Sequence, residues 1–167
     1  MNEEFEKKKI RLTPAQALPR IQHFCAYQER CHQEVRDKLY AYSLSKEDVE
    51  NIIAALITDN YLNEERFAQA YVSGKFRMKK WGRTKILQQL KLKKISDYCI
   101  KKGMQEIDPE EYDMVMRDVA EKKLKSIKGL HPVMKQKKVA LDLISRGFES
   151  DLSWDLVKTL MKELKEI

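Results

Sequence analysis

The chain has 167 residues, the length of one average domain or of several very small modules, and a net charge of +7. Five Gly and four Pro are too few for a loop-rich β protein, and runs rich in Lys, Glu, Leu, Gln and Ala favour helices. No apolar run approaches the roughly 18 residues of a membrane span, no signal-peptide core is present, and three Cys lack framework spacing. We therefore expect a cytoplasmic, helical protein without membrane contact.

One apolar pattern recurs three times. Two apolar residues four apart are followed five residues later by a third: Val35, Leu39 and Leu44, then Ile86, Leu90 and Ile95, then Val139, Leu143 and Phe148. A further apolar residue follows nine positions later: Ile53, Met104 and Val157. Recurrence at a near-constant offset indicates a repeat. Because such apolar pairs are common in helical proteins, three similar helix pairs without true repetition remain an alternative.

The first module is expected over 15–61, after a flexible N-terminal segment over 1–14. Its first helix carries Ile21, Phe24 and Tyr27, and a polar connection containing Cys31 leads to the helix of the first apolar pair. Ser45 precedes two acids and therefore predicts the start of a third helix.

The second module is expected over 62–108 and the third over 109–167. The polar connections after their first helices contain Trp81–Gly82 and His131–Pro132. Ser96 and the Ser150–Asp151 pair predict the starts of their third helices, and Gly147 suits a helix C-terminal cap. Asp108 followed by Pro109 predicts the helix that opens the third module.

These patterns predict an all-α fold of three tandem three-helix modules, similar in outline to helix-turn-helix domains. Each module is too small to bury much core alone, so we expect stacked modules and an elongated molecule that can be curved.

The positive charge is concentrated in residues 75–102, which hold eleven Lys and Arg and one acid, Asp97. The rest of the chain is therefore net negative. A focused basic surface attracts phosphate, because each neutralised phosphate releases condensed counterions. The residues predicted to contact nucleic acid or a nucleoprotein are Lys75, Arg77, Lys79, Lys80, Arg83, Lys85, Lys91, Lys93 and Lys94.

The best candidates are those around the connection to the module's second helix, where a helix N-terminus would add backbone N–H donors for phosphate. Trp81 could stack on a base, but a partly buried anchor for the connection is the favoured interpretation. Lys91, Lys93 and Lys94 could equally form a solvated helix end, where cations are stabilising.

The sequence predicts no metal site, cofactor or catalytic centre. His23, Cys25, Cys31 and His32 lack the short Cys-x-x-Cys clasp of structural zinc sites. No phosphate loop, nucleophile elbow or compact His-plus-carboxylate set is present.

The run from Asp59 to Ala68, with Tyr61–Leu62 followed by acids, Arg66 and Phe67, resembles a signature of the RecX family of recombination regulators. The segment from Trp81 to Ile86, with Leu90 and Ile95 after it, resembles the family's basic segment. Lys94 departs from the pattern, because the family often has Gly before the turn isoleucine.

This resemblance implies an all-helical, non-enzymatic protein without a cofactor that binds the RecA recombinase. Family members lie along the groove of the RecA–single-stranded DNA filament and lower its extension, ATP hydrolysis and strand exchange. They also bind DNA themselves. We accordingly expect RecA and single-stranded DNA, with duplex DNA as a further ligand, to be the partners of a monomeric regulator.

A stand-alone, sequence-independent helical DNA-binding protein is the alternative, as is an adaptor whose basic face meets an acidic partner. A helix-turn-helix transcription factor would need base-reading side chains on a recognition helix. Only Gln88 and Gln89 suggest such readout, and phosphate-type Lys dominates.

Overall fold

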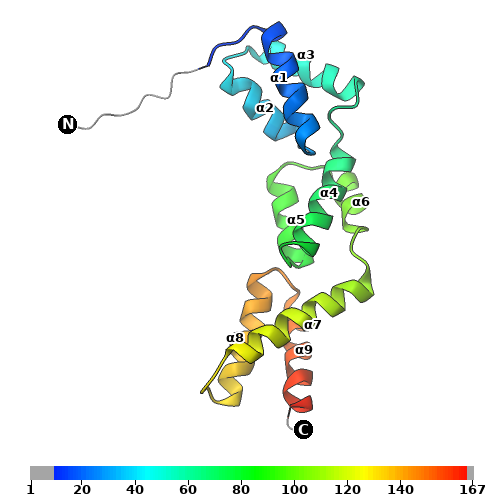
Figure 1. Ribbon diagram of the computed structural model, residues 1–167. Coiled ribbons are helices and arrows are strands. Elements are labelled where there is room, and N and C mark those ends of the chain that lie inside the picture. Colours follow the sequence, from blue (N-terminus) through cyan, green and yellow to red (C-terminus); the bar gives the residue numbers. More distant parts are fainter. Residues whose placement is uncertain (1–9, 165–167) are drawn as a thin grey trace, which may run out of the picture. The chain divides into compact units, whose positions relative to one another are not determined.

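The computed structural model describes residues 10–164, and these form nine α-helices and no strand (Figure 1). The all-helical prediction is therefore confirmed. The chain divides into two compact units, Met1–Phe67 and Ala68–Ile167. The elongated shape and the module boundaries stay predictions, and most of the predicted flexible segment 1–14 lies outside the described residues.

The first unit is built from α1 (Pro14–Tyr27), α2 (His32–Ala41) and α3 (Lys46–Thr58), each of which packs against the other two. Their apolar stripes meet in a core of buried aliphatic side chains. Residues before α1 are attached to this unit, because the Leu12 N–H donates to the Tyr42 carbonyl oxygen at 3.1 Å.

The next three helices are α4 (Glu64–Arg77), α5 (Arg83–Leu92) and α6 (Asp97–Met104). Most of α4 belongs to the second unit together with α5 and α6. Helix α5 packs on α6, and both apolar residues of the recurring pair on α5, Ile86 and Leu90, are fully buried.

The second unit ends with α7 (Pro109–Ser126), α8 (Pro132–Ser145) and α9 (Ser150–Glu163), which pack on one another. None of the described helices is long and apolar enough to cross a membrane.

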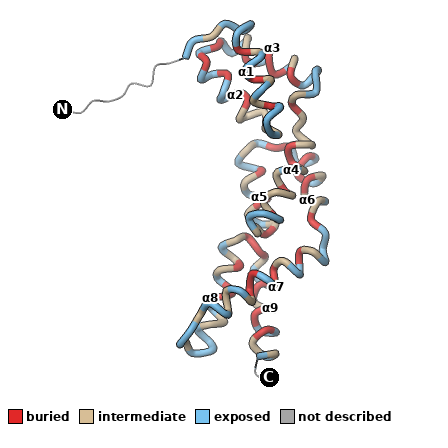
Figure 2. The backbone as a smooth tube through the Cα atoms, viewed as in Figure 1, coloured by how far each residue is buried: buried red, intermediate tan, exposed pale blue. Residues whose placement is uncertain are grey.

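The nine helices of residues 10–164 form three triplets, which are α1–α3, α4–α6 and α7–α9. The recurring apolar pattern marks the buried core of each triplet (Figure 2). All nine of its residues are buried: Val35, Leu39, Leu44, Ile86, Leu90, Ile95, Val139, Leu143 and Phe148. The pairs lie on α2, α5 and α8, so equivalent positions of equivalent helices carry them. A three-helix repeat is thus present in the fold.

The second helix of each triplet ends in the same left-handed turn. The φ angles are 61° at Ser43, 59° at Lys94 and 94° at Gly147. After α5, the Lys94 N–H donates to the Lys91 carbonyl and the Ile95 N–H to the Leu90 carbonyl; the turn at Gly147 repeats this pattern. The predicted glycine cap is confirmed, and Lys94 adopts the same conformation although its Cβ makes it costly.

Helix starts follow the predicted capping chemistry with one exception. The side chains of Ser45, Ser96 and Asp108 accept hydrogen bonds from the first turns of α3, α6 and α7. The predicted start of α9 at the Ser150–Asp151 pair is confirmed, but the capping role is not, because the N-cap is Glu149, which makes no side-chain capping bond. Its carboxylate is bonded instead to Arg83 and Tyr112.

The second and third helix triplets are joined by a close backbone contact between Gly82 and Gly147. The Gly82 N–H donates to the Arg146 carbonyl at 2.9 Å, and the Thr84 N–H donates to the Gly147 carbonyl at 3.0 Å. A Cβ added to Gly82 would lie 2.2 Å from the carbonyl carbon and oxygen of Gly147. Only glycine therefore permits this approach, which we call the glycine contact.

Tyr112 fills the space beside the glycine contact. Its ring is fully buried, stacks on Phe76 with centroids 5.7 Å apart and lies 5.3 Å from Phe148. Because the three rings come from α4, α7 and the connection between α8 and α9, their burial fixes the third triplet against the second.

We expect Gly82→Ala to lower the free energy of unfolding by about 1–3 kcal/mol or more, because its methyl group would overlap the Gly147 backbone. Gly74→Ala is the matched control: a Cβ there meets nothing within 4 Å, so the better helix propensity of Ala should stabilise α4 by about 1 kcal/mol. Urea unfolding followed by circular dichroism measures both. Equal midpoints for the two variants would contradict the glycine contact.

We expect Lys94→Gly to raise the free energy of unfolding by about 0.5–1 kcal/mol, because glycine adopts a φ near 59° without a steric penalty. Lys94→Ala removes the same charge but keeps the Cβ, so it should bring no such gain. Thermal unfolding of the two variants side by side separates the backbone effect from the charge effect.

Candidate nucleic-acid interface

Three lysines of the basic stretch gather around two aromatic rings. The Lys75 and Lys85 ammonium groups lie 5.0 and 4.4 Å from the centroid of the Trp81 ring. Lys75 also lies 5.2 Å from the centre of Tyr71, and Lys93 lies 5.8 Å from it. We call Lys75, Lys85 and Lys93 with these two rings the lysine cluster. Each cation–π contact is worth roughly 0.5–1 kcal/mol at exposed sites and restrains the ammonium groups near one another.

Trp81 is partly buried and contacts two of the three lysines of this cluster. Its backbone N–H donates to the Lys75 carbonyl at 3.1 Å, which ties the connection to the end of α4. Two ammonium groups already lie over its ring, which leaves less of the ring open to a stacking base. The geometry therefore favours an anchor that positions lysines over a stacking platform.

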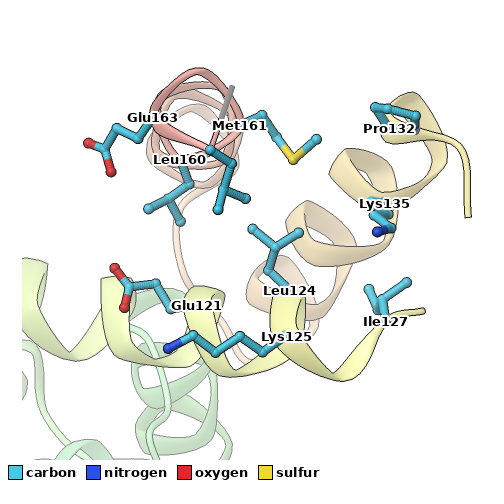
Figure 3. Close-up of a pocket in the computed structure, with 10 residues that line it drawn as sticks. Glu121, Leu124, Lys125, Ile127, Pro132, Lys135, Leu160, Met161 and Glu163 are labelled. Carbon is cyan, nitrogen blue, oxygen red and sulfur yellow. The ribbon is translucent and has the colours of Figure 1, made fainter. Parts of the chain in front are cut away.

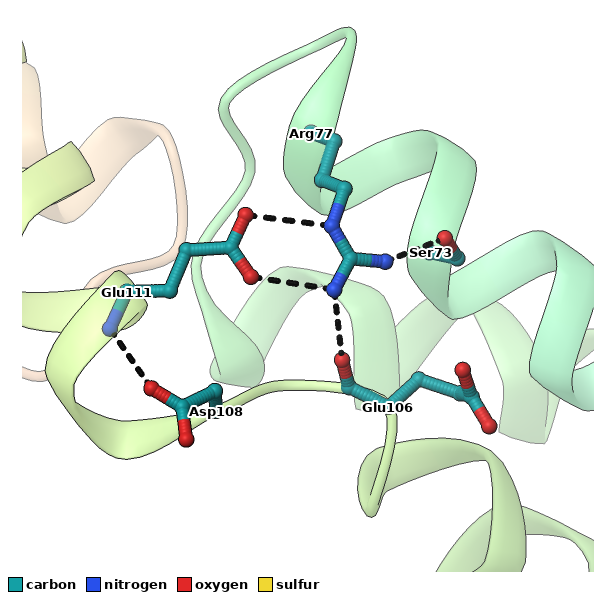
Figure 4. A network of polar contacts seen from close by, with 5 residues as sticks. All are labelled: Ser73, Arg77, Glu106, Asp108 and Glu111. Carbon is teal, nitrogen blue, oxygen red and sulfur yellow. Dashed lines mark hydrogen bonds and ion pairs between the residues drawn. The ribbon is translucent and has the colours of Figure 1, made fainter.

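The Arg77 guanidinium donates hydrogen bonds to several groups within the second unit (Figure 4). Its guanidinium forms a two-pronged ion pair with Glu111, at 3.0 Å and 2.9 Å. It also donates to the Ser73 hydroxyl at 2.6 Å and to the Glu106 carbonyl at 3.2 Å. The pKa of Arg77 is raised above its ordinary value, chiefly by the hydrogen bond to Glu111.

Arg83 is also held by the third helix triplet. Its guanidinium carbon lies 3.8 Å from the centroid of the Tyr112 ring, and one of its nitrogens lies 3.4 Å from the Glu149 carboxylate. The Tyr112 hydroxyl donates to the same carboxylate. Burial, followed by this hydrogen bond, raises the pKa of Tyr112 above its usual range, so the hydroxyl stays protonated.

The first two backbone donors of α5 are also occupied. The Arg83 N–H donates to the Tyr112 hydroxyl at 3.1 Å, and the Thr84 N–H donates to Gly147. These two N–H groups are therefore not open to phosphate, because the third triplet accepts them, and the expected contribution of this helix N-terminus is reduced accordingly. The accepting groups are 29 and 63 residues away in sequence, too far for local pattern to reveal.

The other candidate lysines are distributed differently. Lys79, Lys91 and Lys94 are exposed. Lys80 is partly buried and lines a pocket with residues of the third triplet, among them Lys122, Lys123 and Arg146. Lys122, Lys123 and Arg146 are not among the residues predicted to contact nucleic acid, and no local sequence pattern places them beside Lys80.

A larger pocket, of about 580 Å³, lies among α7, α8 and α9 (Figure 3). Leu124 of α7 and Leu160 and Met161 of α9 point into it, and the charged groups of Glu121, Lys125 and Glu163 lie around it. Glu121 and Glu163 are both paired with Arg117. Its apolar lining does not suit phosphate, and none of the predicted site residues lines it.

Within residues 10–164, no group of three or more His, Cys, Asp and Glu side chains could hold a metal ion. Cys25, Cys31 and Cys99 are all buried, without disulfides. Burial raises the pKa of the Cys25 thiol to about 11, so it is protonated at neutral pH and behaves as a core residue.

The lysine cluster therefore lies beside the glycine contact that joins the second and third triplets. Residues 63–104, which contain α4, α5 and α6, match the family model described as RecX, second three-helix domain. The chain is 29% identical to the regulatory protein RecX of Prosthecochloris aestuarii, over 80% of this chain and 86% of that protein. It is 28% identical to RecX of Lactobacillus gasseri, over 99% of this chain but only 61% of the relative. It covers 52% of the Bacillus mycoides relative, so several relatives are considerably longer.

Solved structures agree in fold. A crystal structure of regulatory protein RecX superposes with a TM-score of 0.78 at 23% identity, over 87% of this chain and 73% of that chain. RecX from Lactobacillus salivarius superposes with a TM-score of 0.75 at 23% identity, over 92% of this chain and 97% of that one.

We expect Tyr112→Phe to lower the free energy of unfolding by about 1–2 kcal/mol, because the Arg83 N–H and the Glu149 carboxylate would lose a shared hydroxyl partner. Tyr98→Phe, at a side chain that is largely exposed on α6, is the control and should change stability by less than about 0.5 kcal/mol. Denaturant titration of both variants checks this. A Tyr112→Phe midpoint equal to that of the wild type would show that the hydroxyl adds nothing to the junction.

Proposed function

Because this chain belongs to the RecX family of regulatory proteins, we propose that it binds the RecA–single-stranded DNA filament and modulates it, mainly by inhibition. The activities affected are RecA ATP hydrolysis, filament extension and strand exchange. In this proposal the protein acts in the cytoplasm as a monomer, without catalytic activity or a cofactor of its own.

The observation that carries the proposal is the lysine cluster. It lies in the segment that matches the family model, and the rings of Tyr71 and Trp81 hold its three ammonium groups near one another. Lysine ammonium groups bind phosphate as point charges and read no bases, so this surface suits a nucleic-acid backbone of any sequence. Exposed Lys79, Lys91 and Lys94 would extend the same contact.

Arg77 and Arg83 have a different part in this proposal. Each is already paired with a carboxylate of the third triplet, so phosphate would have to compete with Glu111 or Glu149 for it. Both arginines therefore act chiefly by positioning the third triplet. Reversing their charge would disturb the junction, and a loss of binding in such variants could not be assigned to phosphate contacts.

Repetition supplies the physical basis for regulation. A helical filament presents the same surface once per subunit, and a protein with repeated modules can contact successive subunits at once. Contacts across subunits couple their conformational states, because binding favours the arrangement in which all contacts are made. One bound molecule can then restrain several RecA protomers.

The alternative is a stand-alone, sequence-independent DNA-binding protein. It is favoured by the same lysine cluster, since phosphate contact requires no RecA. The two functions differ in the amount of protein required. A filament regulator inhibits when far fewer protein molecules than RecA protomers are present, whereas a competitor for DNA inhibits only when it covers the strand.

The decisive experiment is a titration of RecA ATP hydrolysis on single-stranded DNA with this protein. We expect inhibition at amounts well below one protein per RecA protomer. Inhibition only at amounts sufficient to coat the DNA would contradict the filament proposal and support the alternative.

The same titration should be repeated with Lys75→Gln/Lys85→Gln/Lys93→Gln. Removing three phosphate contacts should reduce the slope of log K against log salt for single-stranded DNA by about 2 and weaken inhibition. The matched control, Lys137→Gln/Lys138→Gln/Lys162→Gln, removes three exposed lysines of α8 and α9 and should bind nearly as the wild type does. Equal losses in both variants would mean that overall charge, and not the lysine cluster, governs binding.

A further inference from the structure

A second basic site lies where the connection between α4 and α5 meets the third triplet. Lys80 of that connection, Lys122 and Lys123 of α7, and Arg146 at the end of α8 line a pocket of about 320 Å³. Asp118 is the one acidic residue in its lining. Four cationic side chains from three separate parts of the chain therefore converge on one concave site.

The charges of this pocket leave a positive excess after its ion pairs are counted. Asp118 accepts from Lys122 at 2.7 Å. Asp142 lies 3.3 Å from the Lys123 nitrogen and 2.9 Å from an Arg146 nitrogen. Two carboxylates thus face four cations, and the net excess corresponds to the charge of one phosphate dianion or two phosphodiesters.

Asp142 stays ionised and holds two of these cations in place. Its burial acts to raise the pKa, but the hydrogen bonds from Arg146 and Lys123 outweigh burial and lower the pKa of Asp142 below its ordinary value. Lys123 and Arg146 are therefore positioned before any ligand arrives, which reduces the entropy lost on binding.

Lys80 enters the pocket lining from a left-handed turn at the end of α4. Its φ is 55°, and its N–H donates to the Phe76 carbonyl at 3.1 Å, so it forms the left-handed cap of α4. Glycine would adopt this conformation without the steric cost that a lysine side chain brings. The left-handed turn therefore fixes the position from which the Lys80 side chain enters the pocket lining.

We infer that this pocket binds a phosphate group, through Lys80, Lys122, Lys123 and Arg146. Charge-assisted N–H donors are the groups that bind phosphate oxygens most strongly, and Arg146 adds a planar donor pair. The phosphate could come from a nucleic-acid backbone or from a free phosphate compound. In either case the third triplet supplies most of the site, so it has a binding role of its own beyond the lysine cluster.

The test uses the full chain labelled with ¹⁵N and observed by NMR at constant ionic strength. One sample is titrated with sodium pyrophosphate and another with a single-stranded oligothymidylate. We expect the amide signals of Lys80, Lys122, Lys123 and Arg146 to shift together and to saturate. Saturation with pyrophosphate would identify a site open to free phosphate compounds, and saturation with the oligonucleotide alone would identify a site for backbone phosphate.

Lys80→Gly is the informative variant, because it removes the charge and also removes the steric cost of a Cβ at a φ of 55°. It should unfold at a higher denaturant concentration than the wild type and yet bind about tenfold more weakly, as the loss of one charge-assisted hydrogen bond predicts. Lys137→Gln removes an exposed lysine of α8 outside the pocket and should bind as the wild type does.

Absence of saturable shifts with both ligands, or unchanged affinity in Lys80→Gly, would overturn the phosphate site. The measurement needs neither RecA nor ATP hydrolysis. Its failure would leave the proposed filament regulation standing, and failure of that regulation would leave this site unaffected.

Discussion

The close approach of Gly82 to Gly147 is the constraint on which the rest of the second unit depends. Two backbone hydrogen bonds cross this contact, and neither could form with a Cβ at either glycine. The contact places the start of α5 against the end of α8, which brings Arg83 to Glu149 and Tyr112. The lysine cluster and the phosphate pocket both border this junction, so their geometry follows from it.

The density of basic residues along the sequence is a poor guide to which of them can bind phosphate. Arg77 and Arg83 belong to the most basic stretch of the chain, yet carboxylates of the third triplet partly neutralise them. Lys75 and Lys85 instead lie over neutral aromatic rings, which restrain an ammonium group without cancelling its charge. Electrostatic attraction of a polyanion therefore concentrates on these two lysines, and on the pocket beside Lys80 only through the excess of its four cations over two carboxylates.

The three repeats share one helix arrangement but differ in the role of the left-handed turn that follows the second helix. Ser43, Lys94 and Gly147 adopt the same left-handed conformation after equivalent helices. Ser43 and Lys94 show that residues with a Cβ can form this turn. Gly147 has a second requirement, because a Cβ there would lie 2.2 Å from the Cβ of Lys85. The same backbone motif is thus a simple helix end in two repeats and an inter-repeat contact in the third.

The sequence by itself determined the helical class, the repeat and its buried positions, because these depend on local periodicity and capping chemistry that residues such as Val35, Ile86 and Val139 express directly. It also located the basic stretch. Only the tertiary structure decided how those charges are used: Glu111, Glu149 and Tyr112 lie 29 to 66 residues from the groups they contact. Such pairings arise from packing between repeats, and no local pattern encodes which distant carboxylate will meet which arginine.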